Sequence, residues 1–286
     1  MTINHEERQT SLHSTDVSAI LNLNHRRTGH TVFLEKQGRL EPWTGNDATD
    51  MGNWLEPSIL NIAESELGPL NRNVVCRATT VDCPLVATLD AQFVDAKPIV
   101  EAKTSGIVGP VYGEWGDEGS DVVPQQYLVQ ASVQMLCSGA ELVHLYALLG
   151  GRGIVRYRIL RDDELIAVIV DQWSQWWDGH IIKGIEPERT AAVPMEVVKR
   201  LRRKPNTEVA LNGDSLSLVA EWESARAAKS AAEKALEAAQ SNLLMLLGDA
   251  EAGRLEDGRL VTYLQTTRKG YTVDESTYRT LRIKKG

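Results

Sequence analysis

The chain has 286 residues, of which 42% are hydrophobic and 24% charged, a composition that excludes an intrinsically disordered protein. No apolar run approaches the roughly 20 residues that a membrane span requires, and the polar first nine residues lack the apolar stretch of a secretory signal. We therefore expect a cytosolic protein with no membrane partner. The net charge of −8 weakly disfavours a polyanionic partner, but basic stretches at residues 26–27, 152–161 and 199–204 keep DNA open as a ligand.

The cysteines and histidines exclude several kinds of metal centre. Three unclustered cysteines provide neither a disulfide framework nor the four thiolates of an iron–sulfur cluster. The six histidines show no spacing typical of zinc ligands. A metal site in this chain must therefore be built from oxygen ligands.

The first half of the chain shows helix signals followed by strand signals. Ser14-Thr15-Asp16 precedes apolar residues at helical spacing and predicts a capped helix start. We expect a short helix over residues 31–36 and a further helix from Met51, with Glu56 near its beginning. Apolar patterns then predict strands over residues 74–80, 85–94 and 99–104.

The next part of the chain continues the alternation of helices and strands. Helical periodicity covers residues 127–137, and a glycine-rich turn joins two predicted strands at 142–149 and 154–160. A further helix begins at Asp162. It contains Trp173, Trp176 and Trp177. Their spacing on an apolar helix favours packing against the sheet over base stacking. This order of elements is typical of an α/β core with a mixed central sheet flanked by helices.

Composition changes towards the C-terminus. A basic connector at residues 199–206 leads into residues 215–247, which are rich in Ala, Glu and Lys and contain no Pro or Gly. This segment predicts one long helix or a broken pair, and a turn at residues 256–259 predicts a short hairpin after it. We therefore expect a core domain over residues 1–190 and a C-terminal helical extension over residues 191–286.

Two acids and a lysine carry the strongest chemical signal. Glu101 and Lys103 lie on one face of a predicted strand, because alternate strand residues point the same way. The turn-like residues 95–98 allow an antiparallel pair that brings Asp90, in the preceding strand, beside Glu101. Two carboxylates can share a hard divalent cation, and a neighbouring ammonium suits the attack of water on a phosphodiester. On its own, an acid-x-lysine triplet is more often a surface ion pair.

The motifs around these residues resemble a known family. They are residues 87–91 (ATLDA), 100–104 (VEAKT), Trp115-Gly116, Pro124 and Tyr127-x-x-Gln130, extended outwards by residues 14–21 (STDVSAIL), 51–57 (MGNWLEP), 150–151 (GG) and 161–166 (RDDELI). In this order they resemble the phage lambda exonuclease / YqaJ-type viral recombinase family of the PD-(D/E)xK nuclease superfamily, over roughly residues 8–190. Ala91 and Ala102 replace the family's usual glycine and bulkier apolar residue, and both substitutions leave the charged groups intact.

The resemblance implies roles for individual residues. The implied catalytic residues are Asp90, Glu101, Lys103, Gln130 and Glu56; the implied metal ligands are Asp90, Glu101, Glu56 and the carbonyl of Ala102; the implied ligands of a DNA 5′-phosphate are Arg8, Thr15 and Thr88, with Tyr127 near the site. Simpler roles stay open for three of them. Glu56 can be an exposed carboxylate favoured at a helix start, Gln130 an amide on a helix face, and Tyr127 a packing residue.

The same resemblance implies a fold and a function. We expect a restriction-endonuclease-like PD-(D/E)xK α/β core and a DNA exonuclease that uses two Mg²⁺ per active site, which Mn²⁺ can replace. The expected substrate is a double-stranded DNA end, degraded 5′ to 3′ on one strand to leave a 3′ tail for a single-strand-annealing protein. Family members include homotrimers that act in phage recombination, so we expect a phage- or prophage-encoded homo-oligomer in the bacterial cytoplasm. A structure-specific or restriction-type endonuclease and a catalytically silent DNA-binding relative remain alternatives.

Overall fold

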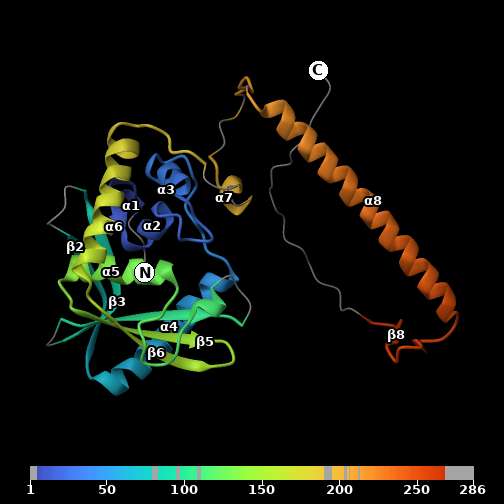
Figure 1. Ribbon diagram of the computed structural model, residues 1–286, viewed down its shortest axis with the longest axis horizontal. Coiled ribbons are helices and arrows are strands. Elements are labelled where there is room, and N and C mark those ends of the chain that lie inside the picture. The colour runs from blue at the N-terminus through green and yellow to red at the C-terminus, as the bar shows by residue number, and fades with distance from the viewer. Residues whose placement is uncertain are drawn as a thin grey trace. The chain divides into compact units, whose positions relative to one another are not determined.

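The computed structural model describes residues 5–78, 83–94, 97–107, 111–189, 195–202, 205, 207–211 and 213–267. It divides into two compact units, Met1–Arg203 and Lys204–Gly286 (Figure 1). The first unit contains, in chain order, α1 (His5–Thr10), β1 (Leu12–His13), α2 (Ser14–Ile20), α3 (Gly29–Lys36), α4 (Asp47–Leu67), β2 (Leu70–Ala78), β3 (Leu85–Phe93), β4 (Ile99–Ser105), η1 (Tyr112–Glu114), α5 (Gln125–Ser138), β5 (Leu142–Leu149), β6 (Gly153–Leu160), α6 (Asp163–Trp176), η2 (Trp177–Ile182) and α7 (Met195–Lys199).

A six-stranded mixed sheet forms the centre of the first unit. β2 pairs antiparallel with β3 along both strands, except at Asn73 and Asp90. The other edge of β3 is shared, because β1 pairs parallel with Leu85 and Val86 and β4 pairs antiparallel with Ala91 and Gln92. β4 then runs parallel to β5, and β5 antiparallel to β6. The sheet therefore forks along β3, with β1 on one arm and β4 on the other.

Helices cover both faces of this sheet (Figure 1). On one face, Ile59 and Leu60 of α4 pack in an apolar cluster with Val100 of β4. On the other face, Ala131 and Met135 of α5 pack in the largest cluster, with side chains of β3, β5 and β6. α2 and α6 extend this second layer through a further apolar cluster.

The pairing of β2 with β3 is distorted near its middle. Asn73 of β2 has a φ of 57°, in the left-handed region, and the register on both sides places it opposite Asp90. Leu89 belongs to the cluster under α5, whereas Ala91 belongs to the cluster under α4. Alternate residues of a regular strand face the same side, so β3 turns over at Asp90.

Local sequence signals fix where several elements begin and turn. The N-caps of α3, α4 and α6 accept a hydrogen bond from the backbone N–H three residues on; the pairs are Thr28 and Thr31, Asn46 and Thr49, and Asp162 and Leu165. The β5–β6 hairpin turns through Gly151 and Gly153, whose φ values of 77° and 78° are rarely adopted by residues with a side chain.

Most predicted elements of the first unit are confirmed, and the predicted fold class is confirmed as a whole. The chief differences lie where periodicity is weak. α1 and β1 were not predicted, because six and two residues are too few to show a period. α4 begins at Asp47, four residues before the predicted Met51, because Asn46 caps it there. The packing role expected of the tryptophans at the end of α6 and the start of η2 is confirmed, since Trp173 and Trp177 are buried.

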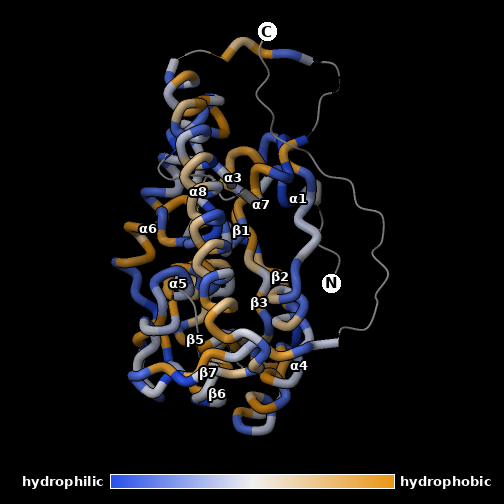
Figure 2. Tube along the Cα trace, turned by 90° about the vertical axis from the view of Figure 1, so that its right-hand side faces the viewer, coloured by the Kyte–Doolittle hydropathy of each residue, from blue (hydrophilic) through white to orange (hydrophobic). Residues whose placement is uncertain are grey.

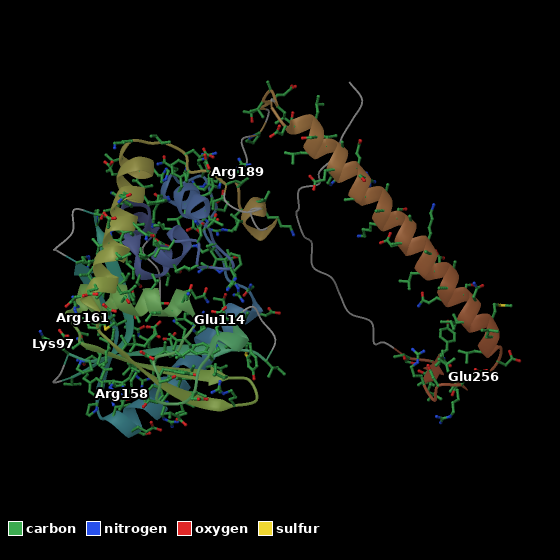
Figure 3. The ribbon with its side chains drawn as sticks, viewed as in Figure 1. Lys97, Glu114, Arg158, Arg161, Arg189 and Glu256 are labelled. Atoms are coloured by element: carbon green, nitrogen blue, oxygen red, sulfur yellow. The ribbon has the colours of Figure 1, made fainter. Side chains whose placement is uncertain are left out.

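The second unit contains α8 (Ser215–Leu247) and a hairpin of β7 (Ala252–Arg254) and β8 (Leu260–Thr262). α8 is one unbroken helix of 33 residues, so the alternative of a broken pair is wrong. None of its residues is buried, and apolar and polar residues are mixed along its length (Figure 2). Glu256 lies in the turn between β7 and β8 (Figure 3), where the sequence predicted a turn. No helix in the described part of the chain is long and apolar enough to cross a membrane.

Trp173 offers a test of the packing between α6 and the sheet. Its side chain is fully buried in the cluster formed with α2 and α5. We expect Trp173→Ala to lower the free energy of unfolding by about 3–5 kcal/mol, since it leaves a large apolar cavity. Urea unfolding followed by circular dichroism measures this. Trp54→Ala serves as the control, because Trp54 is 72% exposed; an equal loss in the two variants would contradict the packing described here.

Candidate active site

Asp90 lies in the fork of the sheet. β1 pairs with β3 before this point and β4 pairs after it, so residues 87–90 have no strand on this edge in the described part of the chain. Thr88 and Asp90, both half-buried, lie in the gap. The backbone N–H of Ala102 in β4 donates to Oδ2 of Asp90 at 2.8 Å. The Asp90 carboxylate thus accepts a hydrogen bond that a backbone carbonyl of a neighbouring strand would accept in a regular sheet.

β4 brings Glu101 and Lys103 to the same gap. The register of β3 with β4 ends at Ala91 opposite Val100, and one further step places Asp90 opposite Glu101. β5 pairs with β4 over the whole length of β4, which holds that strand in place from its other edge. The structure therefore brings the two acids together in the antiparallel arrangement that the sequence predicted.

Three donors surround the buried carboxylate of Glu101, which is only 4% exposed. Oε1 accepts hydrogen bonds from Lys103 Nζ and from Gln130 Nε2, the latter at 2.6 Å. Oε2 accepts one from Gln134 Nε2 at 2.7 Å. Gln130 and Gln134 are one helical turn apart on α5, so both amides point to the same carboxylate.

Sequence reasoning missed Gln134. The residue is fully buried, and its amide completes the hydrogen bonding of Glu101. An amide repeated at i and i+4 on an otherwise apolar helix face is the signal that could have found it, because such residues are neighbours on one face. Gln130, which the sequence did single out, lies as expected beside the acids.

Lys103 lies between the acids and an aromatic wall. Its Nζ is 5.3 Å from the centre of the Tyr127 ring, a cation–π distance. Tyr127 in turn stacks on Trp115, with ring centres 5.5 Å apart and an interplanar angle of 30°. Tyr127 therefore packs against the core and borders the site at the same time.

Burial and like charge perturb the acids. Burial and the neighbouring charge of Glu101 hold the pKa of Asp90 well above its ordinary value of 3.8. Lys103 and the Ala102 N–H offset part of this rise in the pKa of Asp90. Burial, followed by the charge of Glu101, also raises the pKa of Glu56 on α4. The pKa of Lys103 is raised although burial opposes it, because Glu101 and Asp90 favour the ammonium.

These observations fit a hard divalent cation. The pKa of Asp90 stays raised by burial and by the charge of Glu101 although Lys103 is nearby, so one ammonium does not offset the two acids, and oxygen atoms are the ligands that Mg²⁺ prefers. Oε1 of Gln134 is buried and accepts no hydrogen bond from the described residues. Within the described part of the chain, no three His, Cys, Asp or Glu side chains are grouped to hold a metal. A cation here would therefore rest on Asp90, Glu101 and the carbonyl of Ala102, with Glu56 farther away.

A cleft gives access to this group of residues. Its volume is about 620 Å³, and it is lined by Tyr127 and Gln130 of α5, Thr104 of β4 and Thr15 of α2. Gln130 faces the cleft and donates to Glu101, so the buried acids lie directly behind the cleft wall.

The three residues expected at a 5′-phosphate lie around the fork but do not line a single cavity. Thr15 is exposed in the first turn of α2 and lines the cleft. Thr88 lies two residues before Asp90 on β3. Arg8 of α1 lines a second cavity, and its guanidinium lies 3.4 Å from Asp16.

A mixed sheet between two helical layers, with an acid on one strand and an acid-x-lysine on the next, defines a PD-(D/E)xK fold. Residues 5–141 match the model of the YqaJ-like viral recombinase domain. This part of the chain is similar to that domain, and the resemblance seen in the sequence is confirmed.

A curated relative and two solved structures are also similar to parts of this chain. The uncharacterized protein YqaJ of Bacillus subtilis (strain 168) is 29% identical over 186 residues, which are 63% of this chain and 56% of that protein. The chain thus spans little more than half the length of this relative. A provisionally assigned exonuclease from Eubacterium rectale shares the fold, with a TM-score of 0.51 and 11% identity over 72% of this chain and 94% of its own. The alkaline exonuclease LHK-Exo from Laribacter hongkongensis gives a TM-score of 0.49 and 17% identity over 63% and 92%.

The raised pKa of Asp90 predicts a pH-dependent stability of the metal-free protein. A carboxyl whose pKa is higher in the folded state destabilises that state increasingly as pH rises above its ordinary value. Asp90→Asn removes the charge and keeps an acceptor for the Ala102 N–H. We expect its melting temperature in EDTA to exceed that of the wild type by a few degrees at pH 8 (about 2–4 °C per kcal/mol for a domain of this size), and by less at pH 5. A difference that does not change with pH would contradict the repulsion between the acids.

Proposed function

We propose that this protein is a magnesium-dependent DNA exonuclease that degrades one strand of a linear duplex from its 5′ end. The 3′ tail left behind would serve a single-strand-annealing protein in recombination. One observation carries the proposal: the half-buried Asp90 and the buried Glu101, with an ammonium beside them, lie behind the wall of a cleft in the region that matches the YqaJ-like viral recombinase domain. Phosphodiester hydrolysis needs this combination of groups, because negative charge builds up on the phosphate oxygens in the transition state.

Asp90, Glu101 and the carbonyl of Ala102 would hold Mg²⁺ in this proposal. When bound, Mg²⁺ supplies positive charge that stabilises the phosphate oxygens and lowers the pKa of water. A second Mg²⁺ and replacement by Mn²⁺ are part of the same proposal. Glu56 is assigned a longer-range role, since its pKa is raised by burial and, after that, by the charge of Glu101.

Lys103 and Gln130 would position the reacting groups. The ammonium of Lys103 already lies at the acid pair, where it can orient the attacking water and stabilise the negative charge that develops. The amide of Gln130 lies between Glu101 and the cleft, so it can bind a phosphate oxygen of the strand being cut. Gln134 keeps Glu101 oriented from behind, and is a positioning residue.

The proposal also includes how the protein recognises DNA ends and in which oligomeric state it acts. Arg8, Thr15 and Thr88 would bind a 5′-terminal phosphate, which a guanidinium and two hydroxyls suit. The protein would act on duplex DNA ends as a homo-oligomer, with a trimer as the expected form, in the cytoplasm of a bacterial host of the phage or prophage.

Removal of Lys103 tests its role in the chemistry. We expect Lys103→Met to lower the rate of hydrolysis by on the order of 10²–10³, the usual effect of losing one group that stabilises transition-state charge. Release of nucleotides from a labelled linear duplex with Mg²⁺ measures the rate. Lys97→Met is the matched control, because Lys97 is exposed in the β3–β4 turn (Figure 3). Equal activity of the two variants would rule out Lys103 as a catalytic residue.

A comparison of DNA forms separates the exonuclease from its alternatives. We expect Mg²⁺-dependent degradation of linear duplex and no cutting of covalently closed circles, since the proposed reaction begins at an end. Cutting of closed circles would favour a structure-specific or restriction-type endonuclease. If linear duplex stays intact with Mg²⁺ and with Mn²⁺, the silent DNA-binding alternative gains and the proposed activity fails.

Arg8 tests the proposed recognition of the 5′ end. We expect Arg8→Ala to reduce the preference for 5′-phosphorylated over 5′-hydroxyl duplexes by about tenfold, because a charge-assisted contact of this kind contributes about 1.5 kcal/mol or more. Initial rates on the two substrates measure this ratio. Arg77→Ala is the control, since Arg77 is exposed and pairs only with Glu7 among the described residues. An equal loss on both substrates would contradict the assignment of Arg8.

A further inference from the structure

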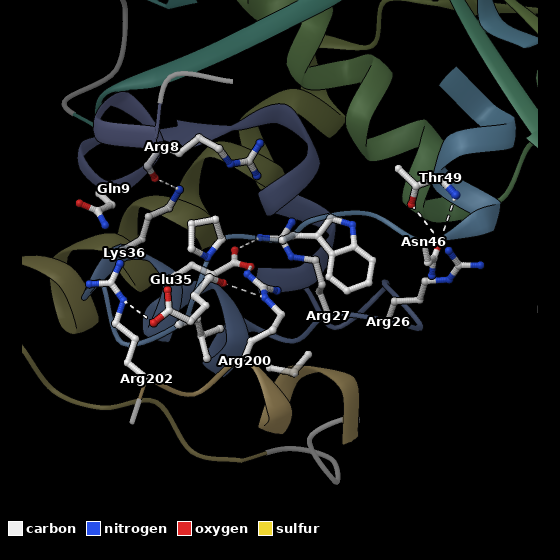
Figure 4. A pocket seen from close by; sticks show the side chains of 15 residues that line it. Arg8, Gln9, Arg26, Arg27, Glu35, Lys36, Asn46, Thr49, Arg200 and Arg202 are labelled. Carbon is white, nitrogen blue, oxygen red and sulfur yellow. Dashed lines mark hydrogen bonds and ion pairs between the residues drawn. The ribbon is translucent and has the colours of Figure 1, made fainter. Parts of the chain in front are cut away.

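A second cavity of the first unit, here called the basic pocket, is rich in cationic side chains (Figure 4). Its volume is about 550 Å³, which is the size of a small-ligand site. Besides Arg8, its wall includes Arg26, Arg27, Lys36, Arg200, Arg202 and the indole of Trp43. None of the last six belongs to the proposed catalytic site.

The pocket is built from two segments far apart in the chain. Leu40 and Leu201 form an antiparallel bridge. Around it, the N–H of Glu41 donates to the carbonyl of Arg200 at 2.7 Å, and the N–H of Arg202 donates to the carbonyl of Arg39 at 3.1 Å. Arg200 and Arg202, which belong to the predicted basic connector, thus line a cavity in the first unit.

The cations exceed the acids that neutralise them. Asp16, fully buried behind the pocket, contacts Lys36 at 2.7 Å and Arg27 at 2.8 Å. Burial acts against its charge, but these cations and Arg8 hold the pKa of Asp16 well below its ordinary value. Glu35 and Glu41 are the only acids on the described wall of the pocket, so six cationic side chains meet three carboxylates. The pocket therefore carries an excess of positive charge in a chain whose net charge is −8.

Part of this cationic surface is free to bind a ligand. The guanidinium of Arg26 contacts no acid of the described residues, and Arg202 approaches Glu41 only to 3.7 Å with half of its side chain exposed. The buried Nε of Arg27 has no hydrogen-bond partner among the described residues. Figure 4 shows Arg26 and Arg202 at opposite ends of the pocket, with Arg27 and Arg200 between them. Two anionic groups, one at each end, would match this arrangement.

Trp43 adds an aromatic surface to the cations. Its side chain is 43% exposed, and the guanidinium of Arg200 lies 5.7 Å from its ring centre. Exposed aromatic rings beside arginines are typical of sites that bind single-stranded nucleic acid, where bases stack and phosphates pair with cations. The basic pocket also adjoins the catalytic cleft, because Arg26 and Thr49 line both cavities.

We propose that the basic pocket binds a nucleotide unit of single-stranded DNA next to the catalytic cleft. Successive phosphates contact Arg26 and Arg202, and the base between them stacks on Trp43. The choice of DNA as the ligand rests on the proposed function. The strand that binds in the basic pocket is one that has separated from the duplex. A cavity of this volume holds about one nucleotide and excludes a double helix.

Binding of a fluorescent oligothymidylate to the full chain in EDTA tests this proposal without catalysis. We expect Arg26→Gln/Arg202→Gln to weaken binding by about tenfold or more. The slope of log K against log[salt] should fall by about 1.4, the value for two phosphate contacts on a single strand. We expect Trp43→Leu to weaken binding by about fivefold or more without changing this slope, because stacking is not ionic.

The control variant is Arg77→Gln/Arg158→Gln, which removes the same charge from exposed positions elsewhere in the first unit. An equal effect of the control and of Arg26→Gln/Arg202→Gln on affinity and slope would overturn the proposal. Displacement of the oligonucleotide by inorganic phosphate or dAMP at the same phosphate concentration would also overturn it, in favour of a free-phosphate or mononucleotide site. Loss of binding in the pocket variants, in a protein that degrades no DNA with Mg²⁺, would refute the proposed function and leave the pocket assigned.

Discussion

The fork in the sheet is the constraint on which the site depends. A strand in the middle of a sheet is normally paired on both edges, and its backbone groups are then used up. β3 is paired with β2 on both sides of Asp90, but its other edge changes partner from β1 to β4. Asp90 lies in the resulting gap, opposite the left-handed Asn73. The distortion gives a buried carboxylate room to face a second one without leaving the sheet.

The donors around Glu101 explain how the fold tolerates a buried acid beside the half-buried Asp90. Burial of an unpaired carboxylate is costly, and here two amides and one ammonium are directed at Glu101. Among the described residues, Asp90 accepts a hydrogen bond from the Ala102 N–H alone, and burial and the charge of Glu101 hold its pKa well above the ordinary value. A site that is incompletely neutralised by its own side chains is suited to a cation that arrives with the substrate.

Near the N-terminus, cationic side chains outnumber the acids instead. There one buried acid, Asp16, gathers three cations and leaves positive charge facing a cavity. The two cavities share part of their walls, so a region short of positive charge adjoins a region with an excess of it. A polyanion bound together with Mg²⁺ would suit both regions, because the cation neutralises the acids and the phosphates pair with the side chains of the basic pocket. This is the physical link between the proposed catalysis and the proposed binding of a strand.

Periodicity predicted the long elements well, and tertiary structure explains the rest. α8 was predicted to its end residues, because an Ala-rich segment without Pro or Gly has strong helix propensity throughout. The proximity of Asp90 and Glu101 followed from strand alternation and a short turn. In contrast, the turnover of β3 at Asp90, the amide of Gln134 on Glu101 and the docking of Arg200 against residues 39–41 depend on contacts between segments distant in sequence. No local pattern encodes such contacts.

The most direct test of the central claim is a crystal structure with Mn²⁺, in which anomalous scattering locates the ion. We expect a peak coordinated by Asp90, Glu101 and the carbonyl oxygen of Ala102, at the fork between β3 and β4. Coordination distances slightly longer than the roughly 2.0–2.1 Å of Mg²⁺ would fit oxygen ligands. The absence of a peak there in crystals saturated with Mn²⁺, or a peak bound elsewhere, would contradict the account.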